Sequence, residues 1–183
     1  YDRLDRSLTK VSSKFGLAKS ITIGLAGDFA ELGIQSEESL AKITELTAAT
    51  EKLGDMDIGA AKDLVQSLYF QAQRSMQMSG QSRNMTFQER EIAAIGAATS
   101  QLNLFNSVEN VTALTLRDLG DAFPEVAAAG TSFGLSMTEL SGMLAPMKAA
   151  GFEVGASANS IKVSLQRLVA PTKQNSDLFK DLS

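Results

Sequence analysis

Residues 134–172 constrain the fold most, because they carry the signals for two short helices and the turn between them. Ser136 followed by Glu139 is a capping-box pattern, in which each side chain bonds a backbone N–H of the first helical turn. A helix is therefore expected to begin just after Ser136. Gly151 suits the left-handed backbone that ends many helices, and Pro171 lacks the donor that a continuing helix needs. The pattern predicts a helical hairpin.

Apolar residues recur at spacings of three and four in both helices of this hairpin. At about 3.6 residues per turn, this spacing places them on one face of each helix. Pro146 falls late in the first stripe, where it would kink or restart the helix. Both faces must be buried, within the chain or against a neighbouring subunit. The residues expected to direct packing and assembly are Leu140, Leu144, Ile161, Leu165 and Leu168.

The remainder of the chain has the composition of a helical protein. Its 183 residues include three prolines, two tyrosines and no tryptophan, whereas residues that favour helix over strand are plentiful. The apolar stripes are interrupted at glycines, which are Gly16, Gly54, Gly80, Gly130 and Gly151. Short isolated helices are marginal in water because nucleation is unfavourable. We therefore predict an all-α fold of short, broken amphipathic helices and hairpins that form a compact bundle packed in an oligomer.

The polar, small and unpatterned residues 80–86 are the best candidate for a linker. They separate an N-terminal helical segment, residues 1–79, from a second helical module, residues 87–183. Thr86 with Glu89 forms another capping pattern at the start of the second module, and Glu91 lies on the otherwise apolar stripe that follows. The sequence thus predicts two helical parts.

Several local signals predict breaks or close packing. Thr115 with Asp118 begins a short helix, and Pro124 stands where a new helix would start and end near Gly130. Gly24 and Gly27 interrupt an apolar stripe and favour either a break or close helix packing. Residues 29–43 and 131–144 share one order of features: helix, glycine, apolar residue, polar cap and acidic first turn. This echo indicates either two related hairpins or a common way of restarting a helix.

No pattern in the sequence points to a catalytic site or a cofactor site. Without Cys or His, it lacks thiolate nucleophiles, disulfides, Cys/His zinc sites and imidazole acid–base groups. Two S-x-x-K tetrads, Ser7 to Lys10 and Ser39 to Lys42, have no accompanying catalytic elements. The net charge of −4 argues against binding to a phosphate backbone. We expect no enzyme activity, no cofactor, no metal site and no specific nucleic-acid binding.

The order of residues in the second module resembles the core region of phage tail tape measure proteins. Three features carry the resemblance. They are a segment of the type "LGLSxxEL", an "AAG" turn and a helix that closes on "LxRLxxPT". The matching positions are Leu116, Gly120, Phe123, Pro124, 127–129, Gly134, Leu135, Ser136, Glu139, Leu140, 149–151, Leu165, Arg167, Leu168, Pro171 and Thr172.

This resemblance implies a structural virion protein in the lumen of the phage tail, made in the host cytoplasm. It implies roles in setting tail length, in nucleating the tail tube and in leaving the tail ahead of the DNA. The implied partners are other copies of the chain, as a trimer, together with tail tube proteins, tail tip or baseplate proteins, assembly chaperones and the host membrane during ejection. The chain would be an excerpt of a longer polypeptide.

Two other functions remain open from the residues alone. A cellular adaptor or signalling bundle would also be all-helical, and it would show regular heptads and a stable isolated fold. A membrane-perturbing segment at residues 21–34 would explain the apolar character of that stretch, although Asp28 and Glu31 interrupt it.

Overall fold

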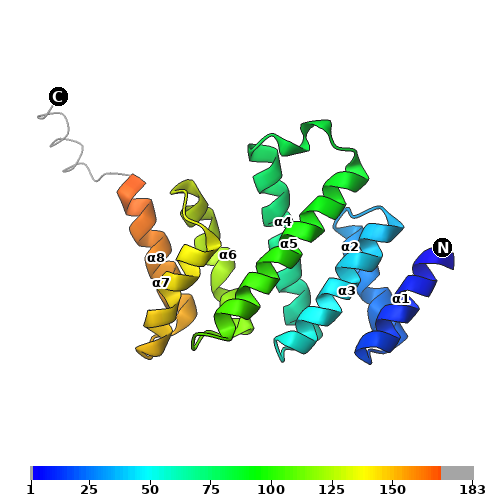
Figure 1. The fold of residues 1–183 in the computed structure, drawn as a ribbon, viewed down its shortest axis with the longest axis horizontal. Coiled ribbons are helices and arrows are strands. Elements are labelled where there is room, and N and C mark those ends of the chain that lie inside the picture. The colour runs from blue at the N-terminus through cyan, green and yellow to red at the C-terminus, as the bar shows by residue number, and fades with distance from the viewer. Residues whose placement is uncertain (1, 170–183) are drawn as a thin grey trace, which may run out of the picture. The chain divides into compact units, whose positions relative to one another are not determined.

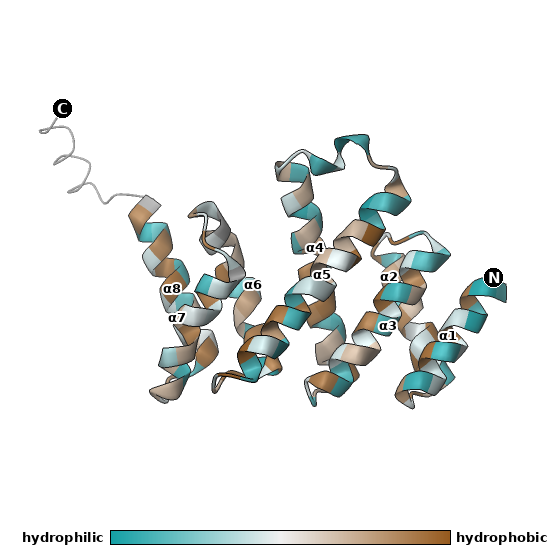
Figure 2. Ribbon diagram, viewed as in Figure 1, coloured by the Kyte–Doolittle hydropathy of each residue, from teal (hydrophilic) through white to brown (hydrophobic). Residues whose placement is uncertain are grey.

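The computed structural model describes residues 2–169, which form eight α-helices and one short 3₁₀ helix and contain no strand (Figure 1). The all-α prediction is confirmed. Apolar and polar residues mix along these helices, as expected of helices that each bury one face (Figure 2). Within the described residues, none of the helices combines the length and the apolar character needed to cross a bilayer.

The chain divides into two compact units, residues 1–106 and 107–183. The division falls inside α5 (Phe87–Glu109), and the predicted linker 80–86 lies within the first unit, where it holds η1 (Gln81–Asn84). The buried carboxylate of Glu91 explains why the start of α5 belongs to that unit. Its oxygens accept hydrogen bonds from the backbone N–H of Gln35 at 2.7 Å and of Ser36 at 3.4 Å. This contact joins α5 to a turn more than fifty residues earlier in the chain.

α3 (Glu37–Leu53) is the central helix of the first unit. α1 (Asp2–Phe15), α2 (Lys19–Glu31) and α4 (Ile58–Met78) all pack against it or against its neighbours. The core residues keep the spacing of three and four seen in the sequence. They include Leu8, Val11, Leu25, Phe29, Leu40, Ile43, Leu64, Val65, Leu68, Ile95, Leu102 and Phe105.

The second unit consists of α6 (Leu116–Ser132), α7 (Met137–Ala149) and α8 (Val154–Val169), preceded by the last residues of α5. α6 packs mainly on α8, and α7 contacts both. Its core includes Leu114, Leu116, Leu119, Phe123, Val126, Leu140, Leu144, Val154 and Ala158.

The prediction of two helices around Pro124 is wrong, because α6 continues through this proline and past Gly130 to Ser132. A proline inside a helix costs about 3 kcal/mol or more, since it lacks a donor and crowds the preceding turn. Leu119, Phe123 and Val126 on the same helix are at most 1% exposed. Burial of such side chains stabilises by roughly 1.5–3 kcal/mol each. The packed face of α6 therefore outweighs the local effect of Pro124, which is itself exposed.

The predictions for Gly24 and Gly27 also differ from the structure. Both glycines lie inside α2, which continues through them, and a Cβ added at either would meet no atom within 4 Å. These residues therefore neither break the helix nor allow another helix of this unit to approach closely.

Five turns between helices share one geometry. A residue with positive φ ends the helix, and the next residue donates its N–H to a carbonyl five positions back, as in a Schellman motif. The positive φ angles are 68° at Gly16, 96° at Gly33, 43° at Asp55, 72° at Gly134 and 86° at Gly151. The five donors are Leu17, Ile34, Met56, Leu135 and Phe152, all apolar. Residues 29–43 and 131–144 both contain this turn, and its presence at three other connections favours a common way of restarting a helix.

Candidate assembly site

The predicted hairpin corresponds to α7 and α8 of the second unit, and α7 begins with a complete capping box. The Ser136 N–H donates to Glu139 Oε2 at 2.7 Å, and the Glu139 N–H donates to Ser136 Oγ at 3.3 Å. The bond from the Ser136 backbone holds the pKa of the Glu139 carboxyl below its usual value. The box fixes the residue at which α7 starts, and so it decides which side chains of α7 face α6.

Four of the five apolar residues expected to direct packing lie in the core of their own unit. Leu140 and Leu144 of α7 are 1% exposed, and Ile161 and Leu165 of α8 are buried as well. Leu168 differs, since it is 72% exposed although it shares the stripe of Ile161 and Leu165. Among the described residues, the neighbouring helices therefore end before the last turn of α8 and leave Leu168 uncovered.

Gly151 and Pro146, which the sequence marks as possible helix ends, lie in different positions. Gly151 takes a φ of 86° at the end of α7, and the following Phe152 donates its N–H to the Met147 carbonyl at 3.0 Å. Pro146 lies inside α7, which continues to Ala149 without restarting. Pro171 lies outside the described residues. The end of the hairpin's first helix is thus set by Gly151 and not by Pro146.

α6 and α7 are in close contact at Gly130. A Cβ at this position would lie 2.6 Å from Leu140 Cδ1 and 2.9 Å from Leu140 Cδ2, so the absence of a side chain makes room for Leu140. The sequence indicated a helix that ends near Gly130, so it gave Gly130 only the role of a helix end. Its pairing with Leu140 depends on how two helices cross, which no local pattern encodes.

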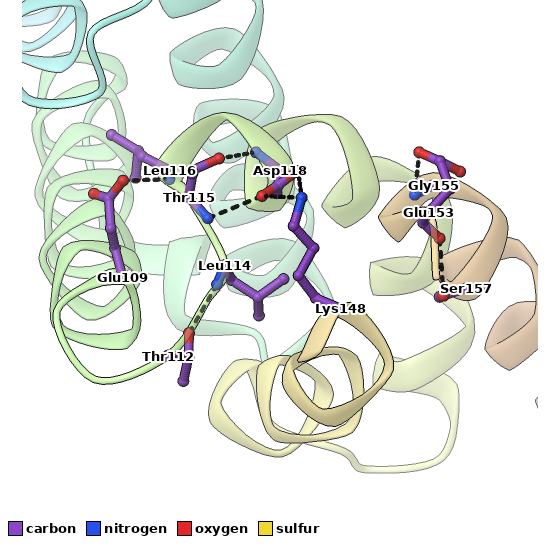
Figure 3. A network of polar contacts seen from close by, with 10 residues as sticks. All are labelled: Glu109, Thr112, Leu114, Thr115, Leu116, Asp118, Lys148, Glu153, Gly155 and Ser157. Carbon is purple, nitrogen blue, oxygen red and sulfur yellow. Dashed lines mark hydrogen bonds and ion pairs between the residues drawn. The ribbon is translucent and has the colours of Figure 1, made fainter. Parts of the chain in front are cut away.

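A polar network lies where the start of α6 meets the end of α7 (Figure 3). The Asp118 carboxylate accepts from the Thr115 N–H at 3.0 Å, and the Asp118 N–H donates to Thr115 Oγ1 at 3.0 Å. Lys148 reaches from α7 and contacts both carboxylate oxygens of Asp118 at 3.0 Å. Burial would raise the pKa of Asp118, but the bonds from Thr115 and Lys148 outweigh burial and hold that pKa below its usual value.

α8 begins with a cap that the sequence did not indicate. The Glu153 carboxylate accepts from the N–H of Gly155 at 2.9 Å and from the N–H of Ala156, and these bonds lower the pKa of Glu153. Lys162 on α8 also pairs with Glu125 on α6, with 2.5 Å between Nζ and Oε2. Each helix of the second unit is therefore tied to another element by a polar contact as well as by apolar packing.

The described residues hold no group of three or more metal-ligating side chains. A groove of about 600 Å³ in the first unit runs along α1 and α3, and charged side chains line it. Lys14 and Glu45 pair across it at 2.6 Å, and Lys42 pairs with Glu38 at 2.8 Å. The Ser39 hydroxyl bonds Ser36 Oγ at 2.6 Å, so the tetrad of Ser39 and Lys42 serves a helix start and a surface ion pair.

A comparison with known protein families matches residues 6–183 to the phage-related minor tail proteins. The chain belongs to this family. Its members are structural components of the virion tail and act in contact with other tail proteins. Searches of curated proteins and of solved structures gave no match. The family thus gives the capped and packed helices of this minor tail protein a structural role in the tail.

Proposed function

We propose that this minor tail protein is part of a tail tape measure protein. In this proposal the parent chain lies in the tail lumen, sets tail length, nucleates the tail tube and leaves ahead of the DNA. The match over residues 6–183 supports a tail role, and the resemblance between Leu116 and Thr172 supports the tape measure type. Its partners are then copies of itself, tube and tip proteins, assembly chaperones and the host membrane during ejection.

Within such a protein, the described helices suit a compact module better than a length-setting rod. A rod acts by extension, at about 1.5 Å per residue in a continuous helix. Among the described helices α5 is the longest, with 23 residues, and the five helices that a Schellman turn ends have 13 to 17 residues. We assign this segment to nucleation or to attachment at one end of the tail, where packing matters more than length.

An in-frame deletion of codons 1–183 from the parent gene tests this assignment, with tail length measured by electron microscopy. We expect failed assembly or tails with defective ends. A segment that acted as a ruler would instead give intact tails shorter by roughly 275 Å, the length of a continuous helix of this many residues. Uniform shortening of that size would contradict the assignment to a compact module.

A second measurement tests the tape measure role itself. Mass spectrometry of purified tails before and after DNA release should detect peptides of this chain only in the filled tails. Peptides that stay in emptied tails at unchanged stoichiometry would show a fixed tail component and would contradict the proposal. Tube and tip proteins in the same samples provide the internal reference.

A further inference from the structure

The groove of about 600 Å³ along α1 and α3, called the α1–α3 groove below, carries its charges in a definite order along its length. Near one end, the bond from Lys42 lowers the pKa of Glu38 and the charge of Arg3 adds to this effect, so Arg3 lies close to Glu38. Near the other end, Lys14 binds Glu45 at 2.6 Å. Each end of the groove therefore combines both signs of charge.

The middle of the groove differs, because the lining residues there include cations but no described carboxylate. These residues are Leu4, Ser7, Lys10, Val11, Ala41 and Lys42. Lys10 forms no ion pair with any of the described residues. The bond of Lys42 to Glu38 joins side chains that are 46% and 42% exposed, and an exposed pair of this kind contributes little stability in water. Lys42 is therefore free to exchange partners, and the middle of the groove offers two positive charges beside an apolar floor.

The shape and charge of this middle section fit an acidic amphipathic helix. α1 and α3 pack side by side, and a groove between two helices accepts the apolar face of a third. The small side chains of Ser7 and Ala41 leave room for close approach. Carboxylates three or four residues apart lie on one side of a helix, so they reach both lysines together. A nucleic acid fits less well, because its phosphates would meet Glu38 and Glu45 on either side of the lysines.

We propose that the α1–α3 groove binds an acidic amphipathic helix of another tail protein, whose carboxylates pair with Lys10 and Lys42. The Ser7 hydroxyl lies one turn before Lys10 in the same groove and donates to the same carboxylates. The tetrad of Ser7 and Lys10 then serves binding and not catalysis. Members of this family act in contact with other tail proteins, and the docking does not depend on the tape measure role.

Fluorescence anisotropy with two labelled peptides tests the chemistry of the occupant on the chain of residues 1–183. The probe is an Ala-rich peptide of about 20 residues, long enough to form a helix in water, with Leu at spacings of three and four and Glu beside them. The control peptide has Gln in place of each Glu. We expect the Glu peptide to bind about tenfold more tightly or better, because its bonds to the lysines are charge-assisted. Equal binding of the two peptides, or no saturable binding of the Glu peptide, would overturn the proposal.

Two charge reversals locate the binding. Lys10→Glu changes the middle of the groove, whereas Arg74→Glu makes the same change in net charge at an exposed position of α4 that does not line the groove. We expect Lys10→Glu to weaken binding of the Glu peptide by about tenfold or more, and Arg74→Glu to change it by less than about twofold. A peptide with Lys in place of Glu should bind Lys10→Glu more tightly than the wild-type chain. Both positions are exposed, and circular dichroism checks that both variants stay folded. Equal effects of the two variants would show attraction to net charge alone and would overturn the proposal.

Two further measurements distinguish the other occupants of the groove. If a single-stranded DNA oligonucleotide displaces the Glu peptide from the wild-type chain and Lys10→Glu abolishes binding of that DNA, the groove takes phosphates and the proposal is overturned. Sedimentation velocity of the chain alone tests for a second copy. Association that rises with concentration and that Lys10→Glu abolishes would show that the chain fills its own groove, which would also overturn the proposal. A monomeric chain that binds the Glu peptide and not the DNA supports a helix from another protein.

Discussion

The hairpins α2–α3 and α6–α7 contain the same kind of turn, but the glycines inside α2 and α6 have different surroundings. Gly33 and Gly134 both take positive φ, and Ser36 and Ser136 both cap the helix that follows. Gly130 in α6 faces inward and makes room for Leu140, whereas Gly24 and Gly27 in α2 face outward into open space. A glycine inside a helix therefore does not by itself indicate a close contact, and only the structure distinguishes Gly130 from Gly24 and Gly27.

The hairpin α7–α8 also has buried residues on its inner face and an exposed residue in its last turn. Substitution of a buried residue there should have the largest effect on stability. Leu165→Asp places an unpaired charge among buried side chains, so we expect it to lower the free energy of unfolding of the second unit by more than about 4 kcal/mol. Hydrogen exchange measured by mass spectrometry would show loss of protection in α6, α7 and α8.

Leu168→Asp is the matched control for that variant, because Leu168 is 72% exposed on the same helix. It should change protection in the second unit by no more than a surface substitution does, about 0.5 kcal/mol or less. If Leu168→Asp unfolds the unit, or Leu165→Asp does not, the assignment of inner and outer residues is wrong.

The second effect concerns the inward glycine. Gly130→Ala adds a methyl group 2.6 Å from Leu140 Cδ1, and Leu140 has little room to move because it is 1% exposed. Overpacking costs about 1–3 kcal/mol, which exceeds the gain of about 1 kcal/mol in helix propensity. We expect a lower free energy of unfolding, measured by urea denaturation with far-UV circular dichroism.

A double-mutant cycle with Leu140→Ala separates this clash from other causes. Removing the Leu140 side chain creates a cavity, but it also gives the new methyl group space, so Gly130→Ala should be nearly neutral or stabilising in that background. Equal effects of Gly130→Ala in both backgrounds would contradict the contact.

Much of the fold and part of the site could be predicted from the sequence, because both depend on short spacings. The capping pairs occur three residues apart, at Thr86 and Glu89, at Thr115 and Asp118 and at Ser136 and Glu139. A capping bond depends only on the local backbone, so the sequence contains all that it needs. The apolar stripes follow the helical period for the same reason.

The remainder depends on residues brought together by packing. Lys148 is thirty residues from Asp118, and Gly130 meets Leu140 across two helices. The position of Glu91 on an apolar stripe indicates a buried carboxylate, which must accept hydrogen bonds. The sequence near Glu91 does not indicate that the donors are Gln35 and Ser36. The exposure of Leu168 shows that a stripe predicts which residues share a face, not how far along the helix that face is covered.

The outward glycines give a smaller effect of opposite sign. Gly24→Ala adds a methyl group where no atom lies within 4 Å, so only the helix propensity changes. We expect the free energy of unfolding of the first unit to rise by about 1 kcal/mol. Tyr69 lies in this unit, and its emission during urea denaturation at low protein concentration is the measurement. Destabilisation under these conditions would show that α2 packs against the chain at Gly24.

The smallest effect is a pH dependence that the second unit owes to its capped helix ends. The pKa values of Asp118, Glu139 and Glu153 are all held low in the folded chain, so these carboxylates favour folding when ionised. This stabilisation is complete above the ordinary pKa values, about 4, and is lost as the pH falls through the lowered values. The protection of α7 and α8 against hydrogen exchange should therefore weaken below about pH 4. Glu139→Gln keeps the shape of the cap and removes its titration, so it should flatten this dependence in α7 while α8 keeps its own through Glu153. An unchanged pH profile in α7 would show that the capping box of Ser136 and Glu139 does not contribute to the stability of the hairpin.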